Sequence, residues 1–411
     1  YDIRAADLQS IVATFAAVFP RGTLWLVGGG DLLLIGSDRS LETDLGQIAD
    51  RMTRPGVAAD LADVAVDDAG GLLSMYVGGP AALQKFAGAA RLQSDDLTAL
   101  EFTAPRGLYE VTADNAATLR RLAAEADLPP VVREALTGRL ATPASWRSRG
   151  RMLLQADAYE AALEAYARAF DLAPADTESA DGMVQAAAGA GQNAVDATLA
   201  RLREVAARDA RHEQVAARVA LSQLLGARGA IDEAAKAVSP LDGSAPDPRA
   251  IEQLAALHAD QGDAERLRFF VDQLQQRWPD RPATAYYRAT FAMLIGQPQD
   301  AIAAAEPASR RHPLDARLQN VLGVAYASVG RRDDARRAFE TALERDPRDA
   351  ATYTNLGLLD LETGQPERAV SRLGEALLLD PDSARALAAL ADALDRLGHS
   401  RRAANIRARL R

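Results

Sequence analysis

Consecutive glycines at residues 28–30 are the first feature of this sequence whose spacing could support chemistry, because glycine-rich loops bind phosphate groups. A dinucleotide-binding loop also needs a further spaced glycine and a following helix, whose backbone N–H groups face the pyrophosphate. Here Leu33 stands where that glycine should be, and the apolar run 32–35 predicts a strand instead of a helix. The pattern therefore favours a tight turn between two strands over a phosphate site.

Side chains that bind metal ions or act as nucleophiles are scarce. The chain contains no cysteine, which excludes disulfides, thiolate metal sites and cysteine nucleophiles. The histidines lie far apart and form no H-x-x-x-H pair of zinc ligands; they are His212, His258, His312 and His399. We therefore expect no metal site, no cofactor and no catalytic residue.

Composition and charge narrow the classes of function. Of the 411 residues, 48% are apolar and only 5% are aromatic, which suits helices packed closely through small side chains. The net charge of -10 argues against general nucleic-acid binding, which needs a basic face. No apolar run reaches the length of about eighteen residues that a membrane-spanning helix needs, so we expect none within this sequence.

Glycine and proline punctuate the second half of the chain at one fixed interval of 34 residues. The glycines are Gly262, Gly296, Gly330, Gly364 and Gly398, and the prolines are Pro279, Pro313, Pro347 and Pro381. Two independent residue types that keep the same period indicate a repeated structural unit. Glycine ends a helix easily because it adopts positive φ, and proline cannot continue one.

The residues within each unit also follow a known pattern. In residues 316–349 they are Leu322, Gly323, Tyr326, Ala335, Phe339, Ala342 and Pro347. The period and these residues resemble the tetratricopeptide-repeat family, which implies two antiparallel helices per unit, packed closely at small residues such as Gly323 and Ala335. The resemblance implies seven full units and a shortened eighth over residues 143–411. It is weakest within 177–247, where a small insertion displaces Gly226 and Gly229.

Residues 1–142 have a different pattern. Apolar residues on one helical face predict a helix over 7–19, which Pro20 ends. The apolar runs 23–27 and 32–35 predict a hairpin of buried strands. Further helices are expected over 41–54, 71–76 and 81–87. A polar connector at 111–142 is expected to hold helices over 114–126 and 131–140.

Short motifs in residues 1–110 match those of an enzyme family. They are Tyr1-Asp2-Ile3, Phe15, Phe19-Pro20, Leu24-Trp25-Leu26-Val27-Gly28-Gly29, Ser94-Asp95-Asp96, Leu100-Glu101-Phe102 and Ala104-Pro105-Arg106. They resemble the carboxyl-terminal part of the spermidine-synthase-like (polyamine aminopropyltransferase) family, most of all its bacterial branch fused to a multi-spanning membrane segment. The resemblance implies the last part of a Rossmann-like, methyltransferase-type fold.

The groups that this family uses for catalysis lie outside the matching segment. Family members bind decarboxylated S-adenosylmethionine on a glycine-rich loop and an acidic residue, and their catalytic Asp also precedes the segment that Tyr1 begins. Positioning two substrates is the main service of such an enzyme, and here the cofactor side has no residues for it. Asp95 and Asp96 are therefore interpreted as caps or loop carboxylates rather than amine-binding acids. Trp25 is interpreted as a core residue rather than a polyamine-stacking wall.

These patterns predict an α+β multidomain protein. A small α/β remnant of a Rossmann-like fold occupies residues 1–110, a helical connector 111–142, and an all-α tetratricopeptide solenoid 143–411. The membrane-fused branch of the resembling family implies membrane attachment through a segment preceding Tyr1. We expect the cytoplasmic rather than the periplasmic side of a bacterial membrane.

In tetratricopeptide proteins the first helix of each unit lines a concave groove, and certain positions of that helix point inward. At these positions the sequence has Arg147, Arg151, Tyr286, Tyr287, Met293, Arg317, Asn320, Asn355 and Arg385. Arginine and tyrosine anchor interfaces well, and asparagine can hydrogen-bond the backbone of an extended peptide. The alternative is that each is simply an exposed helix residue.

The sequence thus predicts a non-catalytic scaffold that binds a protein or peptide partner in its groove, with no nucleic-acid partner. The scaffold would be the soluble part of a larger membrane-associated protein or complex. The alternative is the carboxyl-terminal portion of a polyamine aminopropyltransferase-like enzyme whose cofactor-binding half lies upstream.

Overall fold

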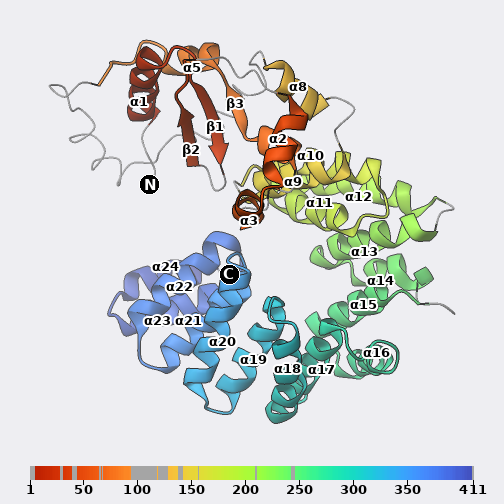
Figure 1. Cartoon of the computed structure of the whole chain (residues 1–411). Coiled ribbons are helices and arrows are strands. Elements are labelled where there is room, and N and C mark those ends of the chain that lie inside the picture. Colours follow the sequence, from red (N-terminus) through yellow and green to blue (C-terminus); the bar gives the residue numbers. More distant parts are fainter. Residues whose placement is uncertain are drawn as a thin grey trace. The chain divides into compact units, whose positions relative to one another are not determined.

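The computed structural model describes residues 5–27, 31–38, 44–63, 66, 68–93, 118, 128–137, 142–155, 157–208, 211–241 and 246–409 (Figure 1). The chain forms two compact units, Tyr1–Ala227 and Arg228–Arg411. The predicted glycine turn at 28–30, the carboxylates Asp95 and Asp96, and the helix expected over 114–126 lie outside the described residues. The domain boundaries after residues 110 and 142 stay predictions.

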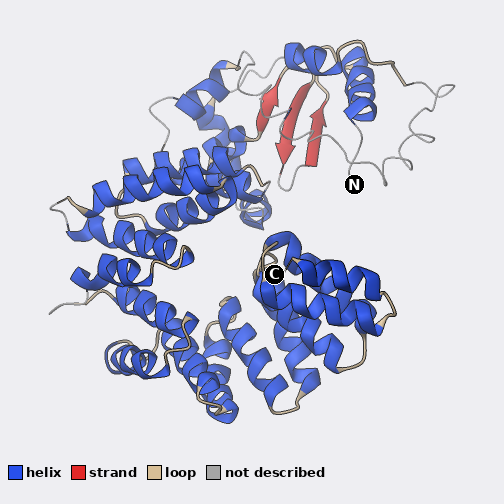
Figure 2. Ribbon diagram, turned by 180° about the vertical axis from the view of Figure 1, so that it is seen from behind, coloured by secondary structure: helices blue, strands red, loops and turns tan. Residues whose placement is uncertain are grey.

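A small antiparallel sheet lies near the amino terminus (Figure 2). Helix α1 (Ala5–Val18) precedes β1 (Thr23–Val27) and β2 (Asp31–Ile35), which pair antiparallel and confirm the predicted hairpin. The prediction that both strands are buried is wrong for β2, whose Leu33 is 48% exposed and whose Ile35 is 42% exposed. Strand β3 (Tyr76–Gly78) pairs with the other edge of β1, so the order is β2-β1-β3. The Rossmann-like relationship and the spermidine-synthase-like resemblance stay predictions.

The helix predicted over 71–76 is wrong at its end. Helix α4 (Ala69–Ser74) stops before Tyr76, which pairs with Trp25 in the sheet. Their rings meet edge to face, with centroids 5.2 Å apart. Tyr76 lies in a strand because it pairs with a residue that is distant in the sequence. Local periodicity cannot reveal such a partner. The other helices among the described residues 5–93 are α2 (Leu45–Met52), α3 (Pro55–Asp63), which was not predicted, and α5 (Pro80–Ala87).

Trp25 lies in a hydrophobic core, as the sequence predicts. It is 9% exposed and belongs to a cluster with Leu73 and with Val132 of α8 (Pro130–Thr137), a short helix within the connector. The hydroxyl of Ser145, in the first repeat helix α9 (Pro143–Gln155), donates to the Asp68 carboxylate at 2.5 Å. Asp68 also caps the start of α4. Packing and hydrogen bonding therefore join the sheet, the connector helix and the first repeat helix.

Paired helices follow to the end of the chain. The first unit continues with α10 (Tyr159–Leu172), α11 (Thr177–Ala190), α12 (Gln192–Ala206) and α13 (Arg211–Ala227). The second begins with α14 (Ile231–Val238), α15 (Pro248–Asp260), α16 (Ala264–Arg277), α17 (Pro282–Leu294) and α18 (Pro298–Arg311). It ends with α19 (Ala316–Ser328), α20 (Arg332–Arg345), α21 (Ala350–Glu362), α22 (Pro366–Leu379), α23 (Ala384–Arg396) and α24 (Ser400–Ala408).

The glycines at the 34-residue interval occupy equivalent turns. The same left-handed φ, between 68° and 78°, is found at Gly262, Gly296, Gly330, Gly364 and Gly398. In the turn after α19, the Gly330 N–H donates to the Ala327 carbonyl at 3.0 Å, and the Arg331 N–H donates to the Tyr326 carbonyl at 2.9 Å. This pairing is a Schellman motif, which satisfies carbonyls at the end of the first helix. The predicted role of these glycines is confirmed.

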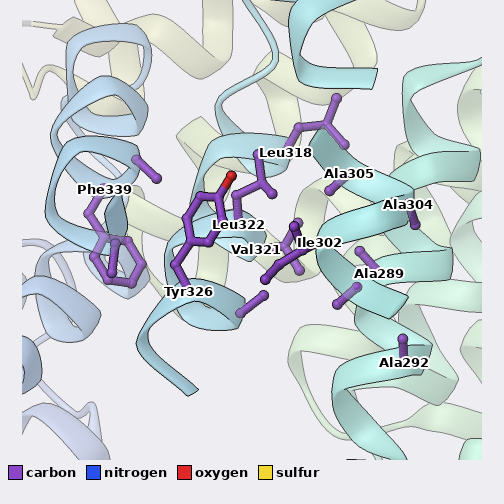
Figure 3. Packing of buried hydrophobic residues seen from close by; sticks show 14 of the residues in the cluster. Ala289, Ala292, Ile302, Ala304, Ala305, Leu318, Val321, Leu322, Tyr326 and Phe339 are labelled. Carbon is purple, nitrogen blue, oxygen red and sulfur yellow. The ribbon is translucent and has the colours of Figure 1, made fainter. Parts of the chain in front are cut away.

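Close packing of the two helices within a unit depends on another glycine. A Cβ atom added to Gly323 would lie 2.4 Å from the Phe339 ring, so a side chain there would force α19 and α20 apart. Phe339 and Ala335 are buried in the same hydrophobic cluster, part of which Figure 3 shows. The next unit repeats the contact, because a Cβ atom at Gly357 would lie 2.7 Å from Leu373. Small residues therefore set the spacing of the helix pairs, as the sequence predicts.

Candidate partner-binding surface

First helices of successive repeats lie next to each other in the second compact unit, namely α15 with α17, α17 with α19, α19 with α21, and α21 with α23. Aspartate caps fix where three of them start. Asp247, Asp315 and Asp349 each accept a backbone N–H from two residues later, at 2.9 to 3.1 Å. Such a carboxylate satisfies an N–H that has no partner within the helix. The caps thereby set the position along each helix of the predicted groove residues.

Tyr286, Tyr287 and Arg317 come together where α17 meets α19. The tyrosine ring centroids lie 5.0 Å apart, and the Arg317 guanidinium carbon lies 5.4 Å from the Tyr286 centroid, within the range of cation–π attraction. Arg317 also donates to Asp315 at 2.8 Å, and its side chain is 52% exposed. Burial raises the pKa of Tyr286 and of Tyr287, so both hydroxyls are neutral at neutral pH. The result is an exposed cation beside a pair of aromatic rings.

Asn320 and Asn355 extend this arrangement from α19 to α21. Asn320 donates to the Asp349 carboxylate at 3.1 Å, and Asn355 donates to the Asn320 side-chain oxygen at 2.8 Å. Asn355 is buried, whereas Asn320 is half-buried. Only Asn320 therefore offers part of its amide to solvent. We use the term polar ladder for Tyr286, Arg317, Asn320, Asp349 and Asn355.

Arg147 and Arg151 lie on α9, in the first compact unit. Arg147 forms ion pairs with Asp176 at 3.0 Å and with Glu178 at 3.3 Å, and Arg151 pairs with Glu178 at 3.1 Å. Both acids stand at the start of α11, whose cap is Asp176. These arginines therefore connect neighbouring first helices of that unit.

Met293 and Arg385 complete the set of predicted residues. Met293 is half-buried and packs against the hydrophobic cluster of which Figure 3 shows a part. Arg385 is exposed near the start of α23. Among the contacts that the structure describes, neither residue takes part in the polar ladder.

The acids in these contacts escaped the sequence analysis. Asp315 and Asp349 precede helices at the repeat interval, which is a capping signal that spacing alone could have identified. Asp360 was also missed. It is fully buried on α21, and its carboxylate lies 2.7 Å from the guanidinium of Arg336 on α20. Its signal in the sequence is an acid inside the apolar run 356–361.

Neither a cluster of metal ligands nor a membrane-spanning helix is found in the described ranges. There, no group of three or more histidine or acidic side chains is placed to hold a metal ion. In the same part of the chain, no helix has the length and apolar character that crossing a membrane requires.

Two family models, both described as tetratricopeptide repeat, match residues 288–350 and 326–392. A comparison with curated proteins gives no match. Similar solved structures include MamA, with 20% identity over 38% of this chain and 91% of MamA, and a TM-score of 0.32. A thermophilic tetratricopeptide protein of Thermus thermophilus has 23% identity over 43% and 97% of the two chains, with a TM-score of 0.39. A tetratricopeptide protein from Parabacteroides merdae has 17% identity over 60% and 90%, with a TM-score of 0.40.

The residues that the family models match contain α18 to α22 in full. They also contain the Schellman turns at Gly296, Gly330 and Gly364. Residues 288–392 of this chain are therefore tetratricopeptide repeats.

Proposed function

We propose that the chain is a non-catalytic scaffold that binds an extended segment of a partner protein along the polar ladder. The observation that carries this proposal is the exposed guanidinium of Arg317, held over the Tyr286 ring on the helix that also carries Asn320. Tyrosine and arginine are the residue types that contribute most to protein interfaces. Because hydrogen bonds to Asp315 and Asp349 already hold Arg317 and Asn320, binding needs little further ordering of these side chains.

The partner chemistry that fits best is an extended segment with an acidic side chain next to an apolar one. The acidic group meets Arg317, whose guanidinium has more N–H donors than the Asp315 carboxylate uses. The apolar side chain packs on the half-buried ring of Tyr286. The Asn320 amide donates to Asp349 and accepts from Asn355, and its second N–H is left to meet the peptide backbone.

A displayed peptide library selected against the purified chain tests this proposal. We expect an enriched peptide whose affinity, measured by fluorescence polarisation, falls at least tenfold in Arg317→Ala, or about 1.4 kcal/mol. Arg310→Ala on α18 is the matched control, because Arg310 is also exposed and paired with an acid, Glu306, at 3.0 Å. It should retain affinity within about twofold. A library that yields no binder, or an equal loss in both variants, contradicts the proposal.

Membrane attachment is a separate proposal, supported by the resemblance of residues 1–110 to the membrane-fused branch. It makes the chain the soluble part of a larger membrane-associated protein or complex, on the cytoplasmic side. Fractionation of the native protein tests it. Recovery in a membrane fraction that only detergent releases supports the proposal, and recovery in the detergent-free supernatant contradicts it.

A further inference from the structure

A pocket separate from the polar ladder lies among α14, α15 and α16, within the second compact unit. Its volume of about 860 Å³ is in the range of ligand-binding pockets. Its walls include Ile231, Lys236, Leu254, His258, Phe269 and Phe270. Helix α14 has 8 residues, whereas α16, α18, α20 and α22 each have 14. The pocket therefore lies beside a second helix that is shorter than those four.

Aromatic rings form a row along this pocket. The His258 ring stacks on Phe270, with centroids 5.5 Å apart and planes within 5° of each other. The Phe270 and Phe269 rings in turn pack edge to face, with centroids 5.2 Å apart. Phe269 ends the row and is 59% exposed. A large apolar ring that faces water at the end of an aromatic row favours contact with one more aromatic ring.

His258, which lines the same pocket, has an unused hydrogen-bonding atom. The residue is 6% exposed, and its Nδ1 has no hydrogen-bond partner among the residues that the structure describes. The nearest carboxylate, Asp263, is 3.8 Å from this nitrogen, which is too far for a hydrogen bond. Burial lowers the pKa of His258, and Arg266 lowers it too, whereas the Asp263 charge and a hydrogen bond of the ring with the Gln261 side chain raise it. Because burial has the largest effect, the ring is neutral at neutral pH. A buried polar atom without a partner is destabilising, and a ligand that reaches it removes that cost.

We propose that this pocket binds a tyrosine side chain of a partner protein, with its ring against Phe269 and Phe270 and its hydroxyl on Nδ1 of His258. Tyrosine fits because its hydroxyl both donates and accepts, so it pairs with either tautomer of a neutral imidazole. The tryptophan N–H can only donate, and phenylalanine has no polar group.

The surroundings of the pocket favour a partner protein over a free ligand. A small free ligand is usually enclosed over most of its surface, and the exposed Phe269 leaves this pocket open. The pocket also includes charged side chains of both signs, Asp232, Lys236, Glu265 and Arg266, which suits the polar rim of a protein interface. No residue of the pocket belongs to the polar ladder, so this inference and the proposed function can fail independently.

Titration of the whole chain with N-acetyl-tyrosinamide tests the inference, with the histidine signals followed by NMR after ¹³C labelling. We expect a saturable shift of the His258 signal. In Phe269→Ala the affinity should fall at least fivefold, and N-acetyl-phenylalaninamide should bind at least fivefold more weakly than the tyrosine probe. Leu314→Ala is the matched control, because Leu314 is a 75% exposed apolar residue outside the pocket. This variant should bind N-acetyl-tyrosinamide with unchanged affinity.

Three results would overturn the binding of tyrosine in this pocket. They are the lack of a saturable shift, equal affinity for the two probes, and equal affinity of the Phe269→Ala and Leu314→Ala variants. A short peptide with a central tyrosine and charged neighbours should bind more tightly than the single amide. If the peptide and the amide bound with equal affinity, the pocket would be assigned to a free aromatic ligand. The proposal that the tyrosine belongs to a partner protein would then be wrong.

Discussion

Asp360 carries a charged side chain at a position from which water is excluded, 2.7 Å from Arg336. Removing one partner of a buried ion pair leaves an uncompensated charge and costs about 3–5 kcal/mol. We expect Arg336→Met to destabilise the second compact unit by about that amount, measured by urea unfolding followed by circular dichroism.

The double variant Arg336→Met/Asp360→Leu separates charge from packing. Because both charges are gone, most of the lost stability should return. The exposed Arg310 pairs with Glu306 at 3.0 Å and serves as the control, since Arg310→Ala should change stability by less than about 1 kcal/mol. A double variant as unstable as Arg336→Met would show that the cost does not come from the unpaired carboxylate.

Tyr76 makes the first compact unit sensitive to alkaline pH. Burial raises the pKa of Tyr76 from 10.0 to about 12, so the folded state holds the phenol proton more tightly than the unfolded chain. This contribution to stability is complete below pH 10 and is lost as the pH rises towards 12. Thermal unfolding of the first unit at stepped pH should therefore show a falling midpoint in this window. The fall should be smaller in Tyr76→Phe and unchanged in the control Tyr353→Phe, which lies in the second unit.

At the scale of helices and turns, replacing each of three glycines by alanine should change the stability, and the sign of the change should depend on the site. Gly330→Ala places a side chain at a φ of 78° and should cost about 1–2 kcal/mol. Gly323→Ala should cost about 1–3 kcal/mol, because its Cβ atom would meet the Phe339 ring. Gly374 lies inside α22 with nothing within 4 Å of an added Cβ atom, so Gly374→Ala should stabilise by about 0.5–1 kcal/mol. Urea unfolding of the three variants measures these differences, and a destabilising Gly374→Ala would contradict the argument.

The same elements show what the sequence could predict. The turn at Gly330 depends on its own backbone, and the repeat interval makes that signal visible five times over. The strand at Tyr76 depends on a distant partner, Trp25, so a local helix pattern gave the wrong state. In the candidate surface, the repeat pattern predicted Arg317 and Tyr286 as groove positions, and the structure places their side chains in contact. It could not give the burial of Asn355, which depends on side-chain packing across α19 and α21.

At the scale of the whole molecule, the hydrophobic clusters of residues 285–406 lie wholly within the second compact unit, residues 228–411. The clusters around Leu322, Leu373 and Leu394 are built from residues of this unit alone. Because the stability of a repeat array is approximately the sum of its units and nearest-neighbour contacts, this fragment should fold by itself. Far-UV circular dichroism should show helix, and urea unfolding should be cooperative.

A second fragment, residues 298–411, supplies the comparison for this prediction. It starts at α18 without its partner α17, and so exposes Ile302 and Ala305, which the full unit buries in the cluster with Ala289 of α17 (Figure 3). Burial of each large apolar side chain contributes about 1.5–3 kcal/mol, so 298–411 should unfold at lower urea than 228–411. If 228–411 lacked helix, or if both fragments unfolded at the same urea concentration, stability would not reside in the contacts between neighbouring helices.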